Sequence, residues 1–514
     1  MTSASQYFSS ADYLLALPMV LLTLFALGIL MIDLMLPPHW KRANAWTALM
    51  GLAFSLAAVI KIQAAYRLVE ASGRGFPVYT AFLGTLIVDR FAIYFFYLFL
   101  IGAAISVLMS VRYLELEHEH HGEFYALILF SVIGMMCMAA GNDIVLIFIG
   151  LELMAISTYV LVGFLRSDRR SNEASLKYLL LGAFSSGIFA YGLSLFYGLT
   201  GSTNLQQIAY RLDAHLRSHP NDPVAVVALL TTATGLFFKI AAVPFHQWAP
   251  DAYEGAPTSV TGYMSVAVKA AAWAMLLRIF LTGIYPMRAL YLPVLVFVSI
   301  ATMTGGNLAA LTQNNLKRLL AYSSISHVGY MLLGLIAGDA RGANPTGIKG
   351  ILIYLLVYTF MNLGAFGVVT SLRRRKIIGD EIDDIAGLYF KAPAEAILML
   401  FFLLSLAGIP PLAGFWGKYF IFLSLIETGH YALASLAVLY AVLGLYYYMR
   451  IGSAMLMRPA LDTEPITVSP GMALALVITG VATVGIGIFP ETFIRAVNWS
   501  LQAQPSGPIA TLLR

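Results

Sequence analysis

The residues best suited to chemistry are ionisable side chains inside long apolar stretches. Lys239 lies in TTATGLFFKIAAVPFHQW, Lys269 in TGYMSVAVKAAAWAMLLR, and Glu152 in IFIGLELMAIS. Lys418 follows the sequence SLAGIPPLAGFWG. A charged group at the centre of a membrane helix costs roughly 2.5–3.5 kcal/mol on insertion scales, and such groups mostly face the bundle interior and mark ion pathways. We therefore predict that these four residues carry a transported ion.

Two further residues are candidates for the same pathway. Lys177 lies near the start of an apolar stretch, and His327 lies in AYSSISHVGYMLLG. An imidazole titrates near physiological pH, which suits a proton relay. The alternatives are that Lys177 extends to the membrane interface and that His327 is only hydrogen-bonded. For Glu152, the alternative is a structural carboxylate paired with a neighbouring group.

Buried lysine and glutamate side chains suit proton transfer for an electrostatic reason. Removal from water favours the neutral form of either group, whereas a nearby opposite charge favours the charged form. A change of charge on one group therefore moves a proton on or off its neighbour. A series of such groups across a membrane has the properties that a proton relay requires.

Two of the apolar stretches are interrupted by proline at similar places. LFFKIAAVP (236–244) and LFFLLSLAGIP (400–410) run alike, and a proline inside a helix removes a hydrogen bond and clashes one turn back. Paired broken helices are typical of transporters built from repeats, with sites at the breaks. Because the two stretches lie five predicted spans apart, an odd number, we predict two inverted five-helix repeats.

The composition is that of a chain embedded in lipid. Of its 514 residues, 60% are hydrophobic and 11% are charged, and the mean hydropathy is +0.80. Soluble domains carry about 25% charged residues. The single cysteine, Cys137, excludes an internal disulfide and a cysteine-rich metal or iron–sulfur site. The sequence contains no HExxH motif that would indicate a metal site. Its net charge of +5 gives no sign of nucleic-acid binding. We expect no cofactor in this chain.

The apolar stretches predict an all-α, polytopic membrane protein with about 14 transmembrane helices. The predicted spans are 13–36, 43–66, 88–111, 123–141, 143–165, 174–199, 224–247, 257–283, 289–311, 316–337, 347–373, 393–426, 431–457 and 468–490. We group them as an N-terminal three-helix segment, a first repeat, a second inverted repeat, and a C-terminal helix with a tail. These units cover 1–121, 122–284, 285–458 and 459–514.

The basic clusters all fall on one side of these spans. They are Lys41 with Arg42, then Arg166, Arg169 and Arg170, then Lys317 with Arg318, and the run Arg373–Lys376. Loops rich in Lys and Arg stay in the cytoplasm. This places both termini on the periplasmic side of a bacterial inner membrane.

Four longer motifs carry a resemblance to a known family. LKYLLLGAFSSG, FKIAAVPFHQWAPDAYEGAPTSVTGYMS, NLKRLLAYSSISHVGYMLLG and GIPPLAGFWGKY are similar to sequences of the proton-conducting antiporter-like family shared by complex I and multisubunit sodium/proton antiporters. The first two motifs most resemble the N type of complex I subunit. The M type has glutamate where Lys418 stands, and the L type has a long lateral helix after the position of Pro490.

The resemblance implies a role for each candidate residue. Glu152 and Lys239 match the acid and lysine of the first half-channel, and Lys177 matches a nearby modulator. Lys269 matches the central connecting lysine and Lys418 the lysine of the second half-channel. His327 matches a relay on the hydrophilic axis between them.

The resemblance also implies partners. The chain is expected among other membrane subunits of complex I, where it moves protons while quinone is reduced elsewhere. Flavin, iron–sulfur clusters and quinone are expected in those partners. Two alternatives remain open, namely a subunit of a cation/proton antiporter without a redox partner, and a structural subunit that only supports its neighbours.

Overall fold

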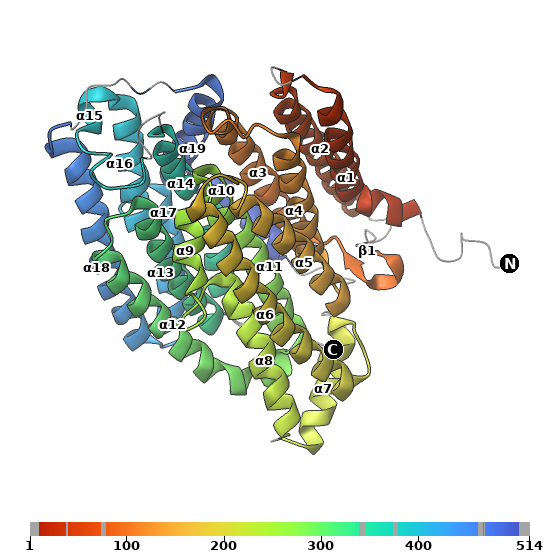
Figure 1. Ribbon diagram of the computed structural model, residues 1–514. Helices are drawn as coiled ribbons and strands as arrows, with labels where there is room; N and C mark the ends of the chain where they lie inside the picture. The colour runs from red at the N-terminus through yellow and green to blue at the C-terminus, as the bar shows by residue number, and fades with distance from the viewer. Residues whose placement is uncertain are drawn as a thin grey trace.

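The protein is a bundle of long helices that run side by side (Figure 1). The computed structural model describes residues 10–37, 40–72, 79–220, 222–338, 345–373, 379–460, 466 and 468–502. Within these residues, 13 helices are long and apolar enough to cross a membrane. The remaining predicted span, 393–426, is a pair of shorter helices. The predicted all-α membrane fold is confirmed.

The elements follow one another in a simple order. In the first half they are α1 (Ser10–Met35), α2 (Ala43–Ser72), β1 (Thr80–Ala81), η3 (Phe82–Gly84), β2 (Leu86–Ile87), α3 (Arg90–Leu116), α4 (Gly122–Ala140), α5 (Ile144–Val162), α6 (Arg169–Thr200), α7 (Leu205–Ser218), α8 (Pro223–Ile240), α9 (Trp248–Gly255), α10 (Thr258–Tyr263), η4 (Met264–Val268), α11 (Lys269–Arg278), η5 (Ile279–Gly283) and η6 (Tyr285–Met287). In the second half they are α12 (Arg288–Leu311), α13 (Leu316–Ala337), α14 (Thr346–Ser371), α15 (Leu388–Lys391), α16 (Pro393–Ala407), α17 (Ala413–Glu427), α18 (Tyr431–Met457), α19 (Pro470–Ile488) and α20 (Glu491–Leu501).

Short polar side chains fix where several spans begin. The carboxylates that cap α3, α5, α6 and α8 each accept a hydrogen bond from a free backbone N–H in the first turn. Such caps satisfy donors that the helix itself leaves open. The capping residues are Asp89, Asp143, Asp168 and Asp222.

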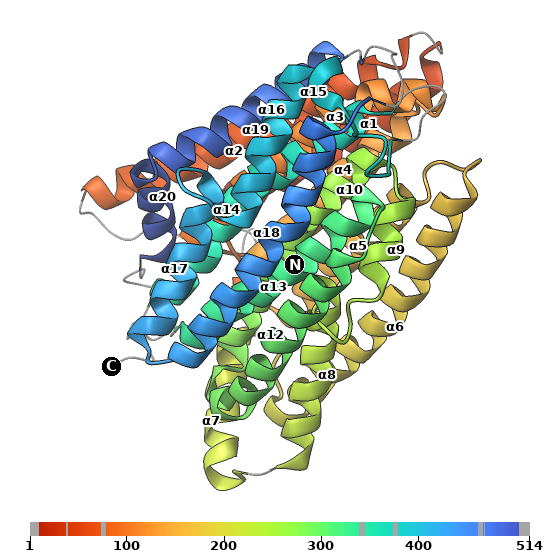
Figure 2. The same cartoon turned by 90° about the vertical axis from the view of Figure 1, so that its left-hand side faces the viewer.

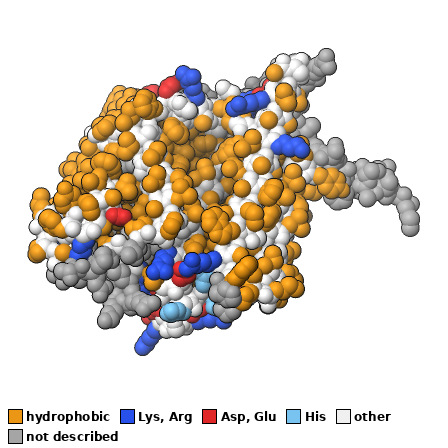
Figure 3. Space-filling view, turned by 90° about the horizontal axis from the view of Figure 1, so that it is seen from above, with side chains coloured by type: hydrophobic (Ala, Val, Ile, Leu, Met, Phe, Trp, Pro, Cys, Tyr) orange, Lys and Arg blue, Asp and Glu red, His pale blue; other side chains and the backbone are white. Residues whose placement is uncertain are grey.

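Burial separates the central helices from the outer ones. The most apolar windows of α13 and α14 are 94% buried, and that of the span Thr258–Gly283 is 89% buried, whereas those of α1 and α18 are 28% buried. The outer helices expose large apolar side chains, and Figure 3 shows apolar side chains covering most of one face. A continuous exposed apolar surface is what lipid or a neighbouring subunit would cover.

Two predicted spans are broken where the prolines indicate. The predicted helix 224–247 ends at Ile240, where Ala241 adopts a left-handed conformation, and the chain resumes as α9 at Trp248. The predicted span 393–426 divides into α16 and α17 around Gly408, which is also left-handed. Both breaks contain a cis X-Pro bond, Val243–Pro244 and Pro410–Pro411.

Some elements have no counterpart in the sequence prediction. The predicted loop 200–223 contains α7, and α20 follows the last span; both helices have one polar and one apolar face. Figure 2 shows α6 and α8 side by side, with α7 at one end of the bundle. The predicted basic residues 374–376 lie outside the described residues, as do the chain ends 1–9 and 503–514.

Candidate functional site

Lys239 lies in the last turn of α8, directly before the first break. Its side chain is buried, and its Nζ donates a hydrogen bond to the hydroxyl of Tyr159 on α5 over 3.3 Å. The ammonium also lies 5.7 Å from the centre of the Tyr159 ring and 5.8 Å from that of Phe238. Aromatic faces attract cations, so Lys239 is surrounded by groups that hold a charge without an ion pair.

Glu152 comes from α5, two turns before Tyr159, and lies near Lys239. Its Oε1 is buried and has no hydrogen-bond partner within the described residues. The carboxylate is close enough to Lys239 for a Coulombic interaction, yet no ion pair or hydrogen bond is formed between the two described side chains. The structure therefore brings the predicted acid and lysine into one region without direct contact.

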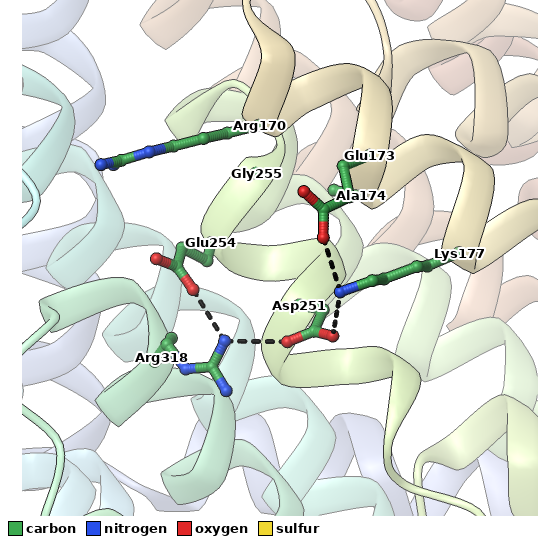
Figure 4. A pocket seen from close by; sticks show the side chains of 8 residues that line it. All are labelled: Arg170, Glu173, Ala174, Lys177, Asp251, Glu254, Gly255 and Arg318. Carbon is green, nitrogen blue, oxygen red and sulfur yellow. Dashed lines mark hydrogen bonds and ion pairs between the residues drawn. The ribbon is translucent and has the colours of Figure 1, made fainter.

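Lys177 lies in a different environment from the other lysines. Its side chain is 47% exposed, and its Nζ forms ion pairs with Glu173 over 2.9 Å and with Asp251 over 3.1 Å. Arg318 also binds Asp251, over 2.8 Å, and Glu254, over 2.7 Å. These residues line a cavity of about 240 Å³, shown in Figure 4.

The electrostatics of this cavity keep Asp251 ionised. Partial burial alone would raise the pKa of its carboxyl group. Hydrogen bonds from Lys177 and Arg318 oppose that effect and leave the pKa of Asp251 below its usual value. The ion pairs that line this cavity are therefore formed at neutral pH.

Lys269 begins α11 immediately after η4, a stretch of π-helix over Met264–Val268. The side chain is buried, and its Nζ donates to the hydroxyl of Ser324 on α13 and to the carbonyl of Ser324 over 3.3 Å. A π-helical turn widens the backbone and is frequent at functional sites. Nothing in the local sequence indicates this turn, so sequence reasoning missed it.

His327 lies one turn further along α13 and is held by two tyrosines. Its Nδ1 lies 2.5 Å from the hydroxyl of Tyr354 on α14, and its Nε2 lies 3.0 Å from that of Tyr448 on α18. The Tyr448 hydroxyl also contacts the hydroxyl of Ser323. The imidazole is thus bound at both nitrogens, as a residue that accepts a proton at one nitrogen and donates from the other would be.

Lys418 lies on α17, just after the second break. Its Nζ donates to the carbonyl of Ala407 over 2.7 Å and to that of Leu406 over 3.1 Å. These two carbonyls belong to the C-terminal end of α16, where the helix dipole is negative. The ammonium also lies 5.2 Å from the centre of the Tyr330 ring on α13.

Helix α13 connects the last three groups. Ser324, His327 and Tyr330 are spaced three residues apart, so they lie along one face of the helix. That face contacts Lys269 at one end and Lys418 at the other, with the imidazole between them. The structure therefore places Lys269, His327 and Lys418 on one buried line through the middle of the bundle.

The hydrogen-bond partners of Lys239, Lys269, His327 and Lys418 are uncharged hydroxyls and carbonyls. The sequence contains 28 tyrosines, so a tyrosine inside a span is no signal by itself. Two weak signals exist: the serines of AYSSISH directly precede His327, and Tyr159 lies seven residues after Glu152 on the same helix. Neither identifies a partner without the fold.

Comparison with known proteins decides the family. Residues 141–444 match the family described as NADH:quinone oxidoreductase/Mrp antiporter, TM. NADH-quinone oxidoreductase subunit N 1 of Koribacter versatilis is 67% identical over 515 residues, which cover 100% of both chains. This chain belongs to the NADH-quinone oxidoreductase subunit N family. All six candidate residues, from Glu152 to Lys418, fall inside the segment that matches.

Two solved structures support the fold of this N-type subunit. A chain of respiratory complex I from Thermus thermophilus with bound Aureothin is 32% identical, with a TM-score of 0.76, and the match covers 93% of this chain and 99% of that one. A chain of the Mrp complex from Dietzia has a TM-score of 0.81 at 21% identity, covering 98% of this chain and 100% of that one. The second likeness concerns the fold alone.

Proposed function

We propose that this chain is an antiporter-like, proton-translocating membrane subunit of respiratory complex I. The observation that carries the proposal is the row of buried ionisable groups on and around α13, in which Lys269, His327 and Lys418 follow one another. Isolated charges inside a membrane bundle are costly, and three on one line are explained by an ion pathway. The membership of the subunit N family names the enzyme.

The contacts around the lysines suggest how a proton moves. Lys239 at Tyr159 and Lys418 at the end of α16 are each held by neutral groups, so either lysine can lose a proton without breaking an ion pair. A charge that arrives on a neighbouring group acts strongly through the low dielectric of the bundle. Protonation of one lysine therefore favours release from the next, and Glu152 supplies the opposite charge beside Lys239.

The second half of the proposal concerns the two breaks, which we assign to two inverted repeats over 122–284 and 285–458. In each break a left-handed residue is followed three positions later by a proline: Ala241 precedes Pro244, and Gly408 precedes Pro411. Each break also lies beside a buried lysine, Lys239 or Lys418. Sites at paired broken helices are characteristic of transporters built from inverted repeats.

The family and the pattern of basic residues indicate the orientation of the chain in the membrane and its neighbouring subunits. We place the face with Arg170, Lys317 and Arg318 in the cytoplasm and both termini in the periplasm of a bacterial inner membrane. Neighbouring membrane subunits adjoin the chain in the bilayer. The flavin, the iron–sulfur clusters and the quinone site belong to partner subunits, where NADH oxidation drives the changes of charge here.

The experiment that tests the assignment is purification of the tagged chain in mild detergent, with a census of its partners and an assay of NADH:quinone reductase activity. Flavin and iron–sulfur subunits with that activity are the expected result. A complex of membrane subunits alone, without redox activity, would contradict it and favour a cation/proton antiporter, whose fold the Dietzia Mrp chain shares.

A further inference from the structure

The charged cavity around Lys177 lies at the end of the bundle opposite α7. It is lined by three basic residues and three acidic ones from α6, α9 and α13. They are Arg170, Lys177, Arg318, Glu173, Asp251 and Glu254. A polar site needs roughly 10–15 Å³ to hold one water, so the volume of about 240 Å³ holds several. The balanced charges create no strong field that would exclude a proton.

A layer of aromatic rings separates this cavity from Lys239. Tyr178 follows Lys177 on α6, and its ring stacks on that of Trp248 at 4.5 Å with 11° between the planes. The Tyr178 ring also meets that of Tyr159 edge-on at 4.6 Å, and Tyr159 binds Lys239. Tyr178 and Trp248 are 1% and 4% exposed, so the layer is closed in this structure.

The short helix α9 carries both the layer and its attachment. Trp248 begins α9, and Asp251 lies three residues later on the same helix. Asp251 joins α9 to α6 through Lys177 and to α13 through Arg318. A hydrogen bond from the Trp248 indole to the carbonyl of Phe238 fixes the ring against the end of α8. Any movement of α9 away from Lys177 therefore moves Trp248 as well.

We propose that α9 is a gate between the charged cavity and Lys239. Trp248 closes the passage, and Asp251 holds α9 in the closed position. The inference rests on the proposed function, because it names the route to a lysine assigned there. Groups that face Asp251 are Lys177, Arg318, Glu173, Glu254 and Arg170. Water advances to Lys239 when the Asp251 ion pairs release and the indole leaves the Tyr178 ring.

The structure supplies a matched pair of variants for testing the gate. Glu173 and Asp251 both bind the Nζ of Lys177, over 2.9 and 3.1 Å, but Glu173 belongs to the same helix as that lysine. Glu173→Gln therefore removes an ion pair without freeing α9. Asp251→Asn removes the ion pair that joins α9 to Lys177 of α6 and one of the two that join α9 to Arg318 of α13, where the Glu254 pair remains. A purely structural or general electrostatic effect would act alike in both variants.

The experiment measures access to position 239 in the assembled complex. Lys239→Cys is introduced with Cys137→Ser, and a membrane-impermeant thiol reagent is applied from the cytoplasmic side of vesicles, with labelling read on the isolated chain. Asp251→Asn, which loses charged hydrogen bonds to both Lys177 and Arg318, is expected to raise the labelling rate by roughly tenfold or more, since one such bond accounts for about tenfold. Trp248→Ala should raise it at least as far. Trp248→Phe, which keeps a ring but loses the indole hydrogen bond to Phe238, should raise it less, and Glu173→Gln should leave it within about twofold.

Two results would overturn the gate: equal labelling in Asp251→Asn and Glu173→Gln, or no increase in Trp248→Ala. Assembly of each variant is checked by the amount of chain in the purified complex, and the comparison of Asp251→Asn with Glu173→Gln keeps the test valid if Trp248→Ala assembles poorly. The proposed function is tested separately, because it requires Lys239→Cys to lose proton pumping. Normal pumping by that chain would contradict the proton pathway whatever the labelling.

Discussion

Gly408 allows the position of Lys418 to be changed without removing its charge. The glycine ends α16 with a φ of 89°, and a Cβ placed on it would lie 2.8 Å from Cδ of Lys418 and 3.4 Å from its Nζ. A contact of 2.8 Å is too short, so the lysine side chain would have to move. Gly408→Ala is therefore expected to displace the ammonium from the carbonyls of Leu406 and Ala407.

The size of the effect follows from two terms. An alanine in the left-handed region costs about 1–2 kcal/mol, and loss of one hydrogen bond from a charged group costs about 1.5–3 kcal/mol. The first term lowers the stability of the chain, and only the second lowers the population with Lys418 in place, by about tenfold or more, since 1.4 kcal/mol is a factor of ten. We expect proton pumping by Gly408→Ala to fall by a similar factor.

Gly429 supplies the control. It also has a positive φ, 75°, but no atom lies within 4 Å of the position of its Cβ. Gly429→Ala therefore carries the backbone cost alone. Both variants are assayed in membrane vesicles for NADH-driven acidification, for quinone reduction, and for the amount of chain in the complex. Equal pumping by the two variants at equal assembly would refute the reasoning about Lys418.

Three further predictions follow from single contacts. Tyr448→Phe removes the hydroxyl that binds His327, so pumping should fall by about tenfold, as expected from one lost buried hydrogen bond; unchanged pumping would exclude the imidazole from the pathway. Arg278→Met breaks a largely buried pair with Asp89, at 2.5 and 2.7 Å, and should destabilise the chain by at most about 3–5 kcal/mol, seen as a lower thermal midpoint in detergent. As the control, Arg495→Met breaks an exposed ion pair with Glu491 and should lower the stability by at most about 1 kcal/mol. Equal thermal midpoints for the two variants would contradict a stabilising role for the Arg278–Asp89 pair. The pKa of Asp251 is lowered below the usual aspartate pKa of about 3.9, so its ion pairs persist at higher pH and are lost only as the pH falls through the lowered pKa. Labelling of Lys239→Cys, normalised to an exposed cysteine, should therefore be constant from about pH 5 to about pH 8.

The sequence was sufficient for the spans and for the location of the breaks. Apolar stretches near spanning length and prolines at Pro244 and Pro410 have local physical consequences, so they can be read without a fold. The burial of Lys239, Lys269 and Lys418 followed from the same reasoning, because a lysine far from a span end has no route to water.

The sequence was not sufficient for the contacts. The sequence left open whether Lys177 belongs to the pathway or extends to the interface. It lies in an open ion-pair cluster, whereas Lys239 is buried at a tyrosine, because α6 begins beside the cavity and α8 ends within the bundle. The π-helical turn before Lys269 and the face of α13 arise from packing between distant helices. Tertiary contacts of this kind leave no periodic signal along the chain.

The central claim is that buried lysines carry the protons, and one measurement tests it directly. The ratio of protons pumped to electrons transferred is determined in proteoliposomes for Lys269→Met and, as the control, for Lys61→Met, which changes an exposed lysine on α2. The account predicts that the ratio falls in Lys269→Met and stays at the parent value in Lys61→Met. A parent ratio in both variants, with both chains fully assembled, would contradict it.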